Sequence, residues 1–324
     1  MSEFRVEVVR VGTVGKHPNA DSLSITRVFD YPVILRTGDF QEGDRAVYVP
    51  IDAVVPADDA RFAFLDGHVR IKAKRLRGIF SMGLLVAADP AWEVGSDVAA
   101  AMRIVKYEPP EPLLMGGDSE RCPFPFPTYT DIEGFRRWPD VLRDGEEVIV
   151  TEKIHGANAR YAWVEGRLWC GSRTSVKKAD PASLWWKAAE RNGLTEKVRA
   201  LEGLAVYGEV FGQVQDLKYG AGKNDCFFRA FDMLELKSGA YLDWDAMTGR
   251  ARAVGLPLVP LLHRGPWSKD LLTLSAGKSE LAAHLREGCV IHPVRERFDE
   301  RVGRVILKMI GEEYLLRKGG TEHH

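Results

Sequence analysis

Two proline-rich runs divide the chain. The first is Tyr107-Glu108-Pro109-Pro110-Glu111-Pro112 and the second is Cys122-Pro123-Phe124-Pro125-Phe126-Pro127. Proline fixes φ and lacks an N–H donor, so neither run can continue a helix or a central strand. We therefore expect a semi-stiff extended linker over 107–127 between a domain at 1–106 and another at 128–324, with the linker phenylalanines packed on one of them. A chain of 324 residues is long enough for two hydrophobic cores.

Composition excludes several classes of protein. A net charge of −1 provides no global field for nucleic acid or membranes, so such a partner must meet a local patch. No apolar run has membrane-spanning length, and the start Met-Ser-Glu-Phe-Arg is not an export signal. Nothing indicates a protein partner. The cysteines have no Cys-x-x-Cys pair and indicate reduced thiols in a cytoplasmic protein, with neither a disulfide frame nor a zinc site: Cys122, Cys170, Cys226 and Cys289.

The first hundred residues predict a small β domain. Turn residues separate several short strand candidates, which favours a small barrel or sandwich: 4–10, 23–29, 31–35, 46–49 and 80–85. The run His17-Pro18-Asn19-Ala20-Asp21 by itself indicates only a turn. It also resembles the loop that opens tRNA-binding OB modules, which favours an OB-type β-barrel.

A basic stretch in this domain has two interpretations. Five basic residues fall in eight positions between Arg70 and Arg77, interleaved with Ile71 and Leu76. In a strand, alternate residues would share one face, where cations gain affinity for a phosphate backbone by releasing counterions. A charged edge strand that resists aggregation explains the pattern equally well. The candidate nucleic-acid-binding residues are Arg70, Lys72, Lys74, Arg75 and Arg77.

The second domain mixes strands and helices. Apolar runs predict strands at 147–152, 159–164, 167–170, 205–212, 226–233, 290–291 and 304–307. Helices are expected at 183–193, which begins with Ser and ends with Gly, and at 275–286. Strands and helices do not alternate regularly, which favours an α+β class with antiparallel sheets.

Lys153 follows one of these strands and precedes Gly156 by three residues. The spacing says little alone, because Lys308 and Gly311 repeat it and a lysine beside a strand is ordinarily a surface cation. Further short segments follow in order: Gly171-Ser172-Arg173-Thr174, Tyr207-Gly208-Glu209-Val210-Phe211-Gly212, Phe228-Arg229-Ala230-Phe231-Asp232-Met233, Glu287-Gly288-Cys289-Val290-Ile291 and Val305-Ile306-Leu307-Lys308.

In this order the segments resemble the collinear motifs of the covalent nucleotidyltransferases, which are ATP-dependent RNA and DNA ligases and capping guanylyltransferases. The resemblance covers about residues 128–318. His155 stands where DNA ligases and capping enzymes usually carry Asp, and the OB-like module precedes the motifs. Both features resemble the Deinococcus-type, nick-sealing RNA ligases. The resemblance implies ATP and Mg²⁺ or Mn²⁺ as cofactors and a nicked RNA-containing duplex as substrate, sealed through lysyl-AMP and an adenylated 5′-end.

The resemblance also implies residue roles. Lys153 would be the nucleophile, and Lys308 would bind the α-phosphate. The remaining roles are Glu152 at the adenine edge, His155 near metal or pyrophosphate, Asn158 and Arg173 near the phosphates, Glu209 at ribose or metal, Phe231 stacked on adenine, and Glu287 at the metal through water.

Outside the ordered set, each of these residues has an ordinary interpretation. Phe231 would be a core strand residue, Glu209 and Glu287 exposed carboxylates, Arg173 a surface ion pair and His155 a loop histidine. The chemistry makes a further demand, because a free lysine has a pKa near ~10.4. Nearby positive charge lowers such a pKa and makes the amine a nucleophile.

One departure from the resemblance concerns that charge. RNA ligases of this group commonly place two lysines one residue apart in the last motif, whereas Ile306 and Ile310 flank Lys308 at that spacing. Arg304 and Lys318 are candidates for the missing cation. Two alternatives remain open: a GTP-using capping-type guanylyltransferase, and a nucleic-acid-binding protein with an unreactive ligase-like fold. The basic, glycine-rich run 218–223 either borders nucleic acid or is a plain connector.

Overall fold

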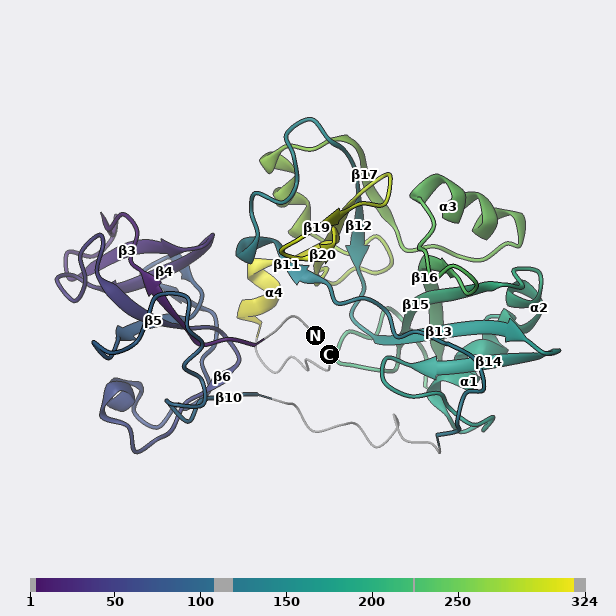
Figure 1. Cartoon of the computed structure of the whole chain (residues 1–324), viewed down its shortest axis with the longest axis horizontal. Helices are drawn as coiled ribbons and strands as arrows, with labels where there is room; N and C mark the ends of the chain where they lie inside the picture. The colour runs from purple at the N-terminus through teal and green to yellow at the C-terminus, as the bar shows by residue number, and fades with distance from the viewer. Residues whose placement is uncertain (1–3, 108–118, 224, 318–324) are drawn as a thin grey trace. The chain divides into compact units, whose positions relative to one another are not determined.

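The computed structural model describes residues 4–107, 119–223 and 225–317, which form two compact units (Figure 1). Within the described chain, the first unit contains 4–107, 133–139 and 315–317. The second contains 119–132, 140–223 and 225–314. The segment 133–139 thus belongs to the first unit, although the predicted domain boundary put it in the second. Residues 108–118 of the expected linker lie outside the described residues.

Contacts with the first unit explain the place of this segment. The Arg136 carbonyl accepts a hydrogen bond of 2.8 Å from Asp30 N, and the Arg137 guanidinium forms an ion pair of 2.6 Å with Glu7. The same guanidinium lies 3.6 Å from the centre of the Phe29 ring. A partly buried arginine with both a carboxylate and an aromatic face is held in one place.

The first unit is built from antiparallel strands. One sheet has the order β1-β5-β9, a second has β2-β3-β4, and β6 pairs with β10 and β7 with β8. Val8, Val47 and Val86 bring the first sheet into one core with Phe62. The elements are β1 (Glu7–Arg10), β2 (Gly15–Lys16), β3 (Leu23–Val28), β4 (Tyr31–Arg36), β5 (Arg45–Val49), β6 (Ala53–Val54), η1 (Ala60–Leu65), β7 (Lys74–Leu76), β8 (Ile79–Ser81), β9 (Leu84–Ala87), β10 (Val105–Lys106), β11 (Glu133–Gly134) and η3 (Phe135–Arg137).

The strand predicted at 80–85 is wrong, because β8 ends at Ser81 and β9 begins at Leu84. Gly83 lies between them with a φ of 74°, and a Cβ there would come 2.5 Å from the Val49 carbonyl oxygen. Only glycine fits this turn without strain, so the chain changes direction here.

The second unit contains two larger antiparallel sheets and the antiparallel pair β19-β20. One has the order β14-β13-β15-β16, and in the other β21, β18, β12 and β17 are neighbours in that order. The elements are β12 (Glu147–Lys153), β13 (Ala157–Val164), β14 (Arg167–Ser172), α1 (Leu184–Arg191), α2 (Leu194–Arg199), β15 (Leu204–Gly212), β16 (Cys226–Glu235), α3 (Trp244–Ala253), β17 (Leu261–Pro266), η4 (Lys269–Ser275), β18 (Gly288–Pro293), β19 (Phe298–Asp299), β20 (Gly303–Arg304), β21 (Leu307–Ile310) and α4 (Glu312–Leu316).

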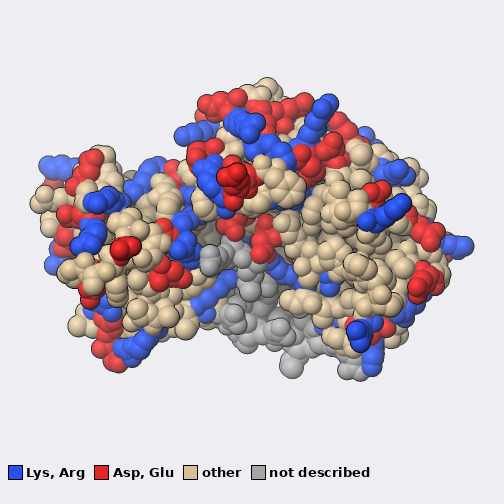
Figure 2. All heavy atoms as spheres, viewed as in Figure 1, with Lys and Arg blue, Asp and Glu red and all other residues tan. Residues whose placement is uncertain are grey.

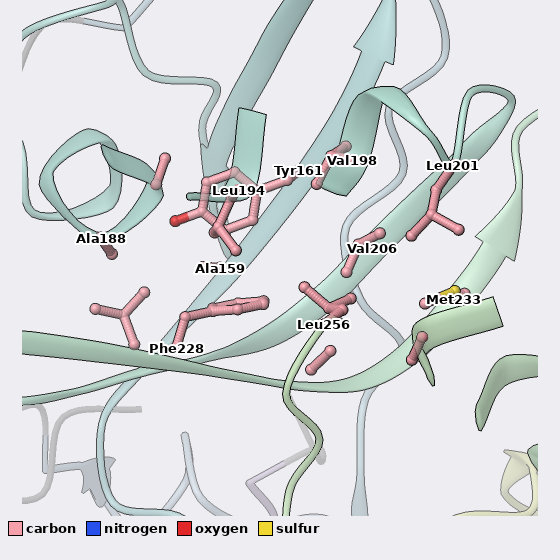
Figure 3. Close-up of a cluster of buried hydrophobic side chains, with 14 of the residues drawn as sticks. Ala159, Tyr161, Ala188, Leu194, Val198, Leu201, Val206, Phe228, Met233 and Leu256 are labelled. Atoms are coloured by element: carbon pink, nitrogen blue, oxygen red, sulfur yellow. The ribbon is translucent and has the colours of Figure 1, made fainter. Parts of the chain in front are cut away.

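The main core of the second unit lies between the β14-β13-β15-β16 sheet and its helices (Figure 3). Tyr161, Val206 and Phe228 come from the sheet, and Ala188 and Leu194 come from α1 and α2. The opposite face of this sheet is also buried, partly by the linker: the Phe124 ring lies 5.3 Å from that of Trp169. The linker phenylalanines therefore pack on the second unit, as expected.

The helix predicted at 183–193 is confirmed as α1, whereas the helix predicted at 275–286 is wrong. After η4 the chain forms an isolated bridge between Lys278 and Leu285. The Arg286 guanidinium donates to the carbonyls of Leu274 and Lys278, and Gly277 has a φ of 99°. Side-chain hydrogen bonds to carbonyls and a left-handed glycine replace the helical pattern here.

We predict that Gly208→Ala destabilises the second unit by about 1–3 kcal/mol, because the added Cβ would overlap the buried Phe228 ring and overpacking has this cost. Thermal unfolding should show a lower Tm. Gly249→Ala is the control, since a Cβ at this exposed position in α3 meets nothing within 4 Å. It should leave the Tm unchanged or raise it. Equal losses in both variants would contradict the packing argument.

Candidate active site

Lys153 is the last residue of β12 and forms an ion pair with Glu287. The Lys153 side chain is 21% exposed and that of Glu287 only 4%. The pairing follows from the register, because Lys153 lies opposite Gly288, the residue after Glu287. The amine therefore reaches solvent while its partner carboxylate does not.

Two glycines let neighbouring strands pass close to Lys153 and Glu287. A Cβ on Gly156 would overlap the Val210 carbonyl and lie 2.9 Å from Glu209 Cγ. A Cβ on Gly288 would overlap the Met309 carbonyl and lie 2.9 Å from the Ile310 Cα. Each glycine therefore allows another strand to approach a functional side chain. This is the physical basis of Lys-x-x-Gly at 153–156 and of Glu-Gly at 287–288.

The two sheets of the second unit face each other at this site. Val290 packs against the cluster that contains Tyr207. Val290 lies opposite Lys308 in β21, and Tyr207 lies two residues before Glu209 in β15. Opposed residues share a face, as do alternate residues of a strand. The side chains of Lys308 and Glu209 therefore point into the interface between the sheets. Lys153 and Lys308 share one face, since Lys153 is two residues from Thr151, which also opposes Val290.

The two carboxylates at the site differ in proton affinity. Burial raises the pKa of Glu209 to about 8, with the Lys153 charge opposing this and Glu287 adding to it. Burial acts in the same direction on Glu287, but the ion pair with Lys153 outweighs it and lowers the pKa of Glu287 below its usual value. The lowered pKa keeps Glu287 a carboxylate at neutral pH, whereas an added positive charge beside Glu209 would lower its raised pKa.

Two buried oxygens at the site are unpaired. Asn158 Oδ1 and Glu287 Oε2 accept no hydrogen bond from any residue that the structure describes. Asn158 lies opposite Glu209 in the sheet. A buried acceptor without a donor is costly, so these oxygens fit a bound cation or ligand. Within the same residues, no three His, Cys, Asp or Glu side chains form a metal cage. The oxygens suit a divalent ion whose remaining ligands are phosphate oxygens and water.

The His155 imidazole is buried, with 3% exposure, and both ring nitrogens are engaged. Nε2 lies 2.7 Å from Asp216 Oδ1, and Nδ1 lies 2.9 Å from the Tyr314 hydroxyl. Glu287 Oε2 is 3.5 Å from the same Nδ1. His155 is thus part of the site, through Glu287.

Phe231 lies at a β-bulge in β16, where the pairing with β15 shifts after Tyr207. Bulges redirect side chains and are frequent beside active sites. The Tyr129 ring lies edge-on to Phe231 at 4.8 Å, and its hydroxyl donates a hydrogen bond of 2.8 Å to Asp232. The partly buried Phe231 ring is therefore fixed in orientation.

Arg173 and Glu152 are placed differently. Arg173 follows β14 and forms an ion pair with Asp131, and its charge also lowers the pKa of Glu209 against the effect of burial. Glu152 alternates with Lys153 along β12, so its side chain points to the opposite face. There it accepts hydrogen bonds from Ser279 Oγ and from Glu280 N. The structure therefore joins Arg173 to the site and separates the Glu152 carboxylate from it.

Arg304, a candidate for the missing cation, is committed elsewhere, and that prediction is wrong. Its guanidinium is 4% exposed, pairs with Asp232 and Glu296 at 2.6 Å, and lies 3.7 Å from the Tyr241 ring centre. Ile306 is buried in the core beside Tyr207. Lys318 lies outside the described residues.

Sequence reasoning missed the residues that hold the loop after Lys153. Gln215 donates to the Gly156 carbonyl, and the Tyr219 hydroxyl accepts a hydrogen bond of 2.8 Å from His155 N. Asp216 and Tyr314 bind the His155 ring. The run 218–223 is therefore more than a connector, because Tyr219 is buried within it. No periodicity marks these residues, and only Gly212 and Gly220, on either side of the loop, could have drawn attention to it.

The family model described as RNA ligase matches residues 146–310, just over half of the chain. The chain belongs to the RNA ligase family. A family described as an OB-fold domain matches residues 5–88 of this RNA ligase. These matches confirm the predicted N-terminal OB-fold domain and nucleotidyltransferase-type ligase domain, and the antiparallel sheets confirm the α+β class.

The fold of this RNA ligase is similar to solved structures of Naegleria gruberi RNA ligase. A variant solved with AMP and Mn has a TM-score of 0.84 at 22% identity, covering 97% of this chain and 98% of that one. A structure with PPi gives 0.84 at 23%, with the same coverage. A variant with ATP and Mn gives 0.83 at 22%, covering 96% and 98%. At such identities the likeness shows the fold alone. A comparison with curated proteins found no match.

The basic stretch of the OB-fold domain is not one continuous strand, which both of its interpretations assumed. Only Lys74–Leu76 is a strand, and residues 71–73 are irregular. Arg70 forms an ion pair of 2.6 Å with Asp52 and lies over the Tyr107 ring at 3.6 Å. The exposed basic residues of the stretch are Lys72, Lys74, Arg75 and Arg77.

The predicted His17–Asp21 turn holds this hairpin. His17 Nε2 lies 3.2 Å from the Leu76 carbonyl, and Asn19 Nδ2 donates to the Arg77 carbonyl at 2.9 Å. On the face drawn in Figure 2, basic and acidic side chains are interspersed, and the net charge of the whole sequence is −1. No helix in the described chain has the length and apolar character needed to cross a membrane.

We predict that Arg304→Ala destabilises this RNA ligase by about 3–5 kcal/mol, because it leaves the buried Asp232 without its counter-ion. Chemical denaturation should show a lower midpoint. Arg301→Ala is the matched control: Arg301 pairs with Asp140 and Asp299 at the surface, where ion pairs contribute little. If both variants lose stability equally, the burial of the Arg304 ion pairs is not the reason for the loss.

Proposed function

We propose that this RNA ligase uses ATP to seal a 3′-hydroxyl to a 5′-phosphate at a nick in an RNA-containing duplex. The observation that carries the proposal is the position of Lys153. Its partly exposed amine contacts the buried Glu287, its charge reaches Glu209 on the facing sheet, and Lys308 lies on its own sheet face. The presence of ATP, AMP, PPi and Mn in structures of Naegleria gruberi RNA ligase supports this assignment.

In the first step, Lys153 Nζ loses a proton to solvent and attacks the α-phosphorus of ATP. A nitrogen–phosphorus bond forms, the bond between the α-phosphorus and the bridging oxygen breaks, and pyrophosphate leaves. Lys308 offsets the negative charge that develops on the transferred phosphate. Arg173 supplies a second cation, because its partner Asp131 is 44% exposed and such a pair has little energy to lose.

In the second step, a 5′-phosphate oxygen attacks the lysyl-AMP phosphorus. A phosphoanhydride forms, and the nitrogen–phosphorus bond to Lys153 breaks. In the third step, the 3′-hydroxyl attacks the 5′-phosphate, loses its proton, and displaces AMP to leave a phosphodiester. Both steps transfer a phosphoryl group between oxygen or nitrogen atoms, so positioning and charge supply most of the catalysis.

The site residues fit a divalent cation and a purine nucleotide. Glu209 and Glu287 would hold the cation, with Asn158 Oδ1 as a further unpaired oxygen. Mg²⁺ and Mn²⁺ prefer oxygen ligands, and the ion would supply positive charge beside the phosphates. Phe231 would stack on adenine. The Glu152 carboxylate has no nucleotide contact in this proposal, because it is bonded on the far face of its sheet.

We predict that the purified protein, incubated with α-labelled ATP and Mg²⁺ or Mn²⁺, retains label after denaturation, and that Lys153→Ala abolishes this label. The control Lys237→Ala removes an exposed lysine of the same domain and should label normally. Glu287→Gln, which removes the charge of a proposed cation ligand, should label at least ~10-fold more slowly. Label from GTP instead would indicate a guanylyltransferase, and no label from either nucleotide would indicate an unreactive binding protein.

The substrate is tested with a panel of nicked duplexes in which RNA and DNA are exchanged on either side of the break. We expect sealing of nicks with RNA strands and a 5′-phosphate, because the fold and motifs are those of the RNA ligase family. Sealing of all-DNA nicks alone would overturn the RNA assignment.

We predict that the OB-fold domain binds the duplex backbone through its exposed basic residues. The triple change Lys72→Ala, Lys74→Ala and Arg77→Ala should weaken duplex binding and reduce the slope of log K against log[salt] by about 0.9 for each lost phosphate contact. Labelling of Lys153 should persist. Arg70→Ala should leave the slope unchanged, since Arg70 is paired with Asp52. An unchanged slope in the triple variant would place the binding surface elsewhere.

A further inference from the structure

The loop that follows Lys153 is held from outside by a second loop and by one tyrosine of α4. Gln215 donates to the Gly156 carbonyl, and the Tyr219 hydroxyl accepts from His155 N at 2.8 Å. These contacts fix the backbone. The His155 side chain is fixed separately by Asp216, between Gln215 and Tyr219, and by Tyr314.

The two partners determine the His155 tautomer. A carboxylate only accepts hydrogen bonds, so Nε2, 2.7 Å from Asp216, carries the ring proton. In the neutral ring Nδ1 is then an acceptor, and the Tyr314 hydroxyl, 2.9 Å away, donates to it. Tyr314 is 3% exposed, so water does not compete for this contact.

This orientation has a consequence for Glu287. Nδ1 lies 3.5 Å from Glu287 Oε2 and, carrying no proton, donates nothing to it. Glu287 Oε2 accordingly remains an unpaired acceptor within the described residues, while Oε1 holds Lys153. A ring turned by half a rotation would direct its N–H at Glu287 and occupy that oxygen. The orientation of the imidazole therefore decides whether Glu287 has a free acceptor.

We propose that Asp216 and Tyr314 are positioning residues that hold the His155 imidazole as the Nε2–H tautomer, with its unprotonated nitrogen towards Glu287. They keep Glu287 Oε2 open for the proposed nucleotide-transfer reaction. Neither residue needs to touch the substrate. The inference rests on the proposed function for its effect on catalysis, but the tautomer itself is a property of the free protein.

The first test is a spectroscopic measurement that needs no nucleotide. Protein labelled with ¹⁵N-histidine is compared with His155→Gln to assign the His155 ring signals. Long-range proton–nitrogen spectra should show His155 as the Nε2–H tautomer, and Asp216→Asn and Tyr314→Phe should shift it towards a mixture. A wild-type ring with a proton on Nδ1, whether as the other tautomer or as the imidazolium, overturns the proposal, and so does an unchanged tautomer in both variants.

The second test is kinetic. Asp216→Asn and Tyr314→Phe should each lower kcat for lysyl-AMP formation by ~10- to 100-fold with a smaller change in the KM for ATP, as loss of a supporting hydrogen bond does. Asp144→Asn, an exposed position in the same unit, is the matched control and should react normally. Thermal unfolding checks that each variant is folded.

A double-mutant cycle separates positioning from general structural damage. In the His155→Gln background, Asp216→Asn should cause no further loss, because the residue through which it acts is absent. Independent, multiplicative losses overturn the proposal. If the wild-type protein forms no lysyl-AMP, the proposed function fails. The histidine spectra still decide whether Asp216 and Tyr314 hold the His155 ring as proposed.

Discussion

The ion pair between Lys153 and Glu287 is the interaction on which the site depends. Taking a carboxylate out of water costs several kcal/mol unless an opposite charge and hydrogen bonds replace the water. Glu287 obtains that charge from the end of β12, because Lys153 lies opposite Gly288, the next residue after Glu287. Gly156 lets β15 approach from the other side, with Glu209 on it. The nucleophile candidate therefore lies beside two glycines, each of which lets a neighbouring strand pass where a larger residue would clash.

That geometry gives the two carboxylates, Glu287 and Glu209, different pKa values. The ion pair with Lys153 keeps the pKa of Glu287 below its usual value, whereas burial raises the pKa of Glu209 to about 8. A pair of acids whose surroundings separate their pKa values is typical of active sites. The lowered pKa favours the charged form of Glu287 in the free protein, and a cation beside Glu209 would lower its raised pKa in turn. Both directions support the proposed binding of a divalent cation together with a nucleotide.

Local patterns predicted much of this architecture. Apolar runs identified the strands around Lys153, and ordered motifs identified Glu209, Glu287 and Lys308 as a set that the structure brings to one interface. Patterns failed where tertiary contacts outweigh local preference. The run 275–286 has helical character, yet Arg286 and Gly277 direct it otherwise, and Glu152 belongs to the far face because strand alternation separates it from Lys153. The contacts of Asp216 and Tyr314 with His155 could not be predicted from the sequence, because 61 and 159 residues respectively separate them from His155.

The missing lysine of the last motif shows how the remaining charge is distributed. Ile306 is part of the core, and Ile310 lies across Gly288 from Lys153, so neither position offers a cation. Arg304 is committed to the buried Asp232 and Glu296, and releasing it would leave two carboxylates uncompensated. Arg173 differs, because its partner Asp131 is largely accessible to water and loses little when the arginine turns to a phosphate. In the proposed mechanism, positive charge for the phosphates would therefore come, among these positions, from Lys308 and Arg173, which increases the share that a bound divalent cation would have to supply.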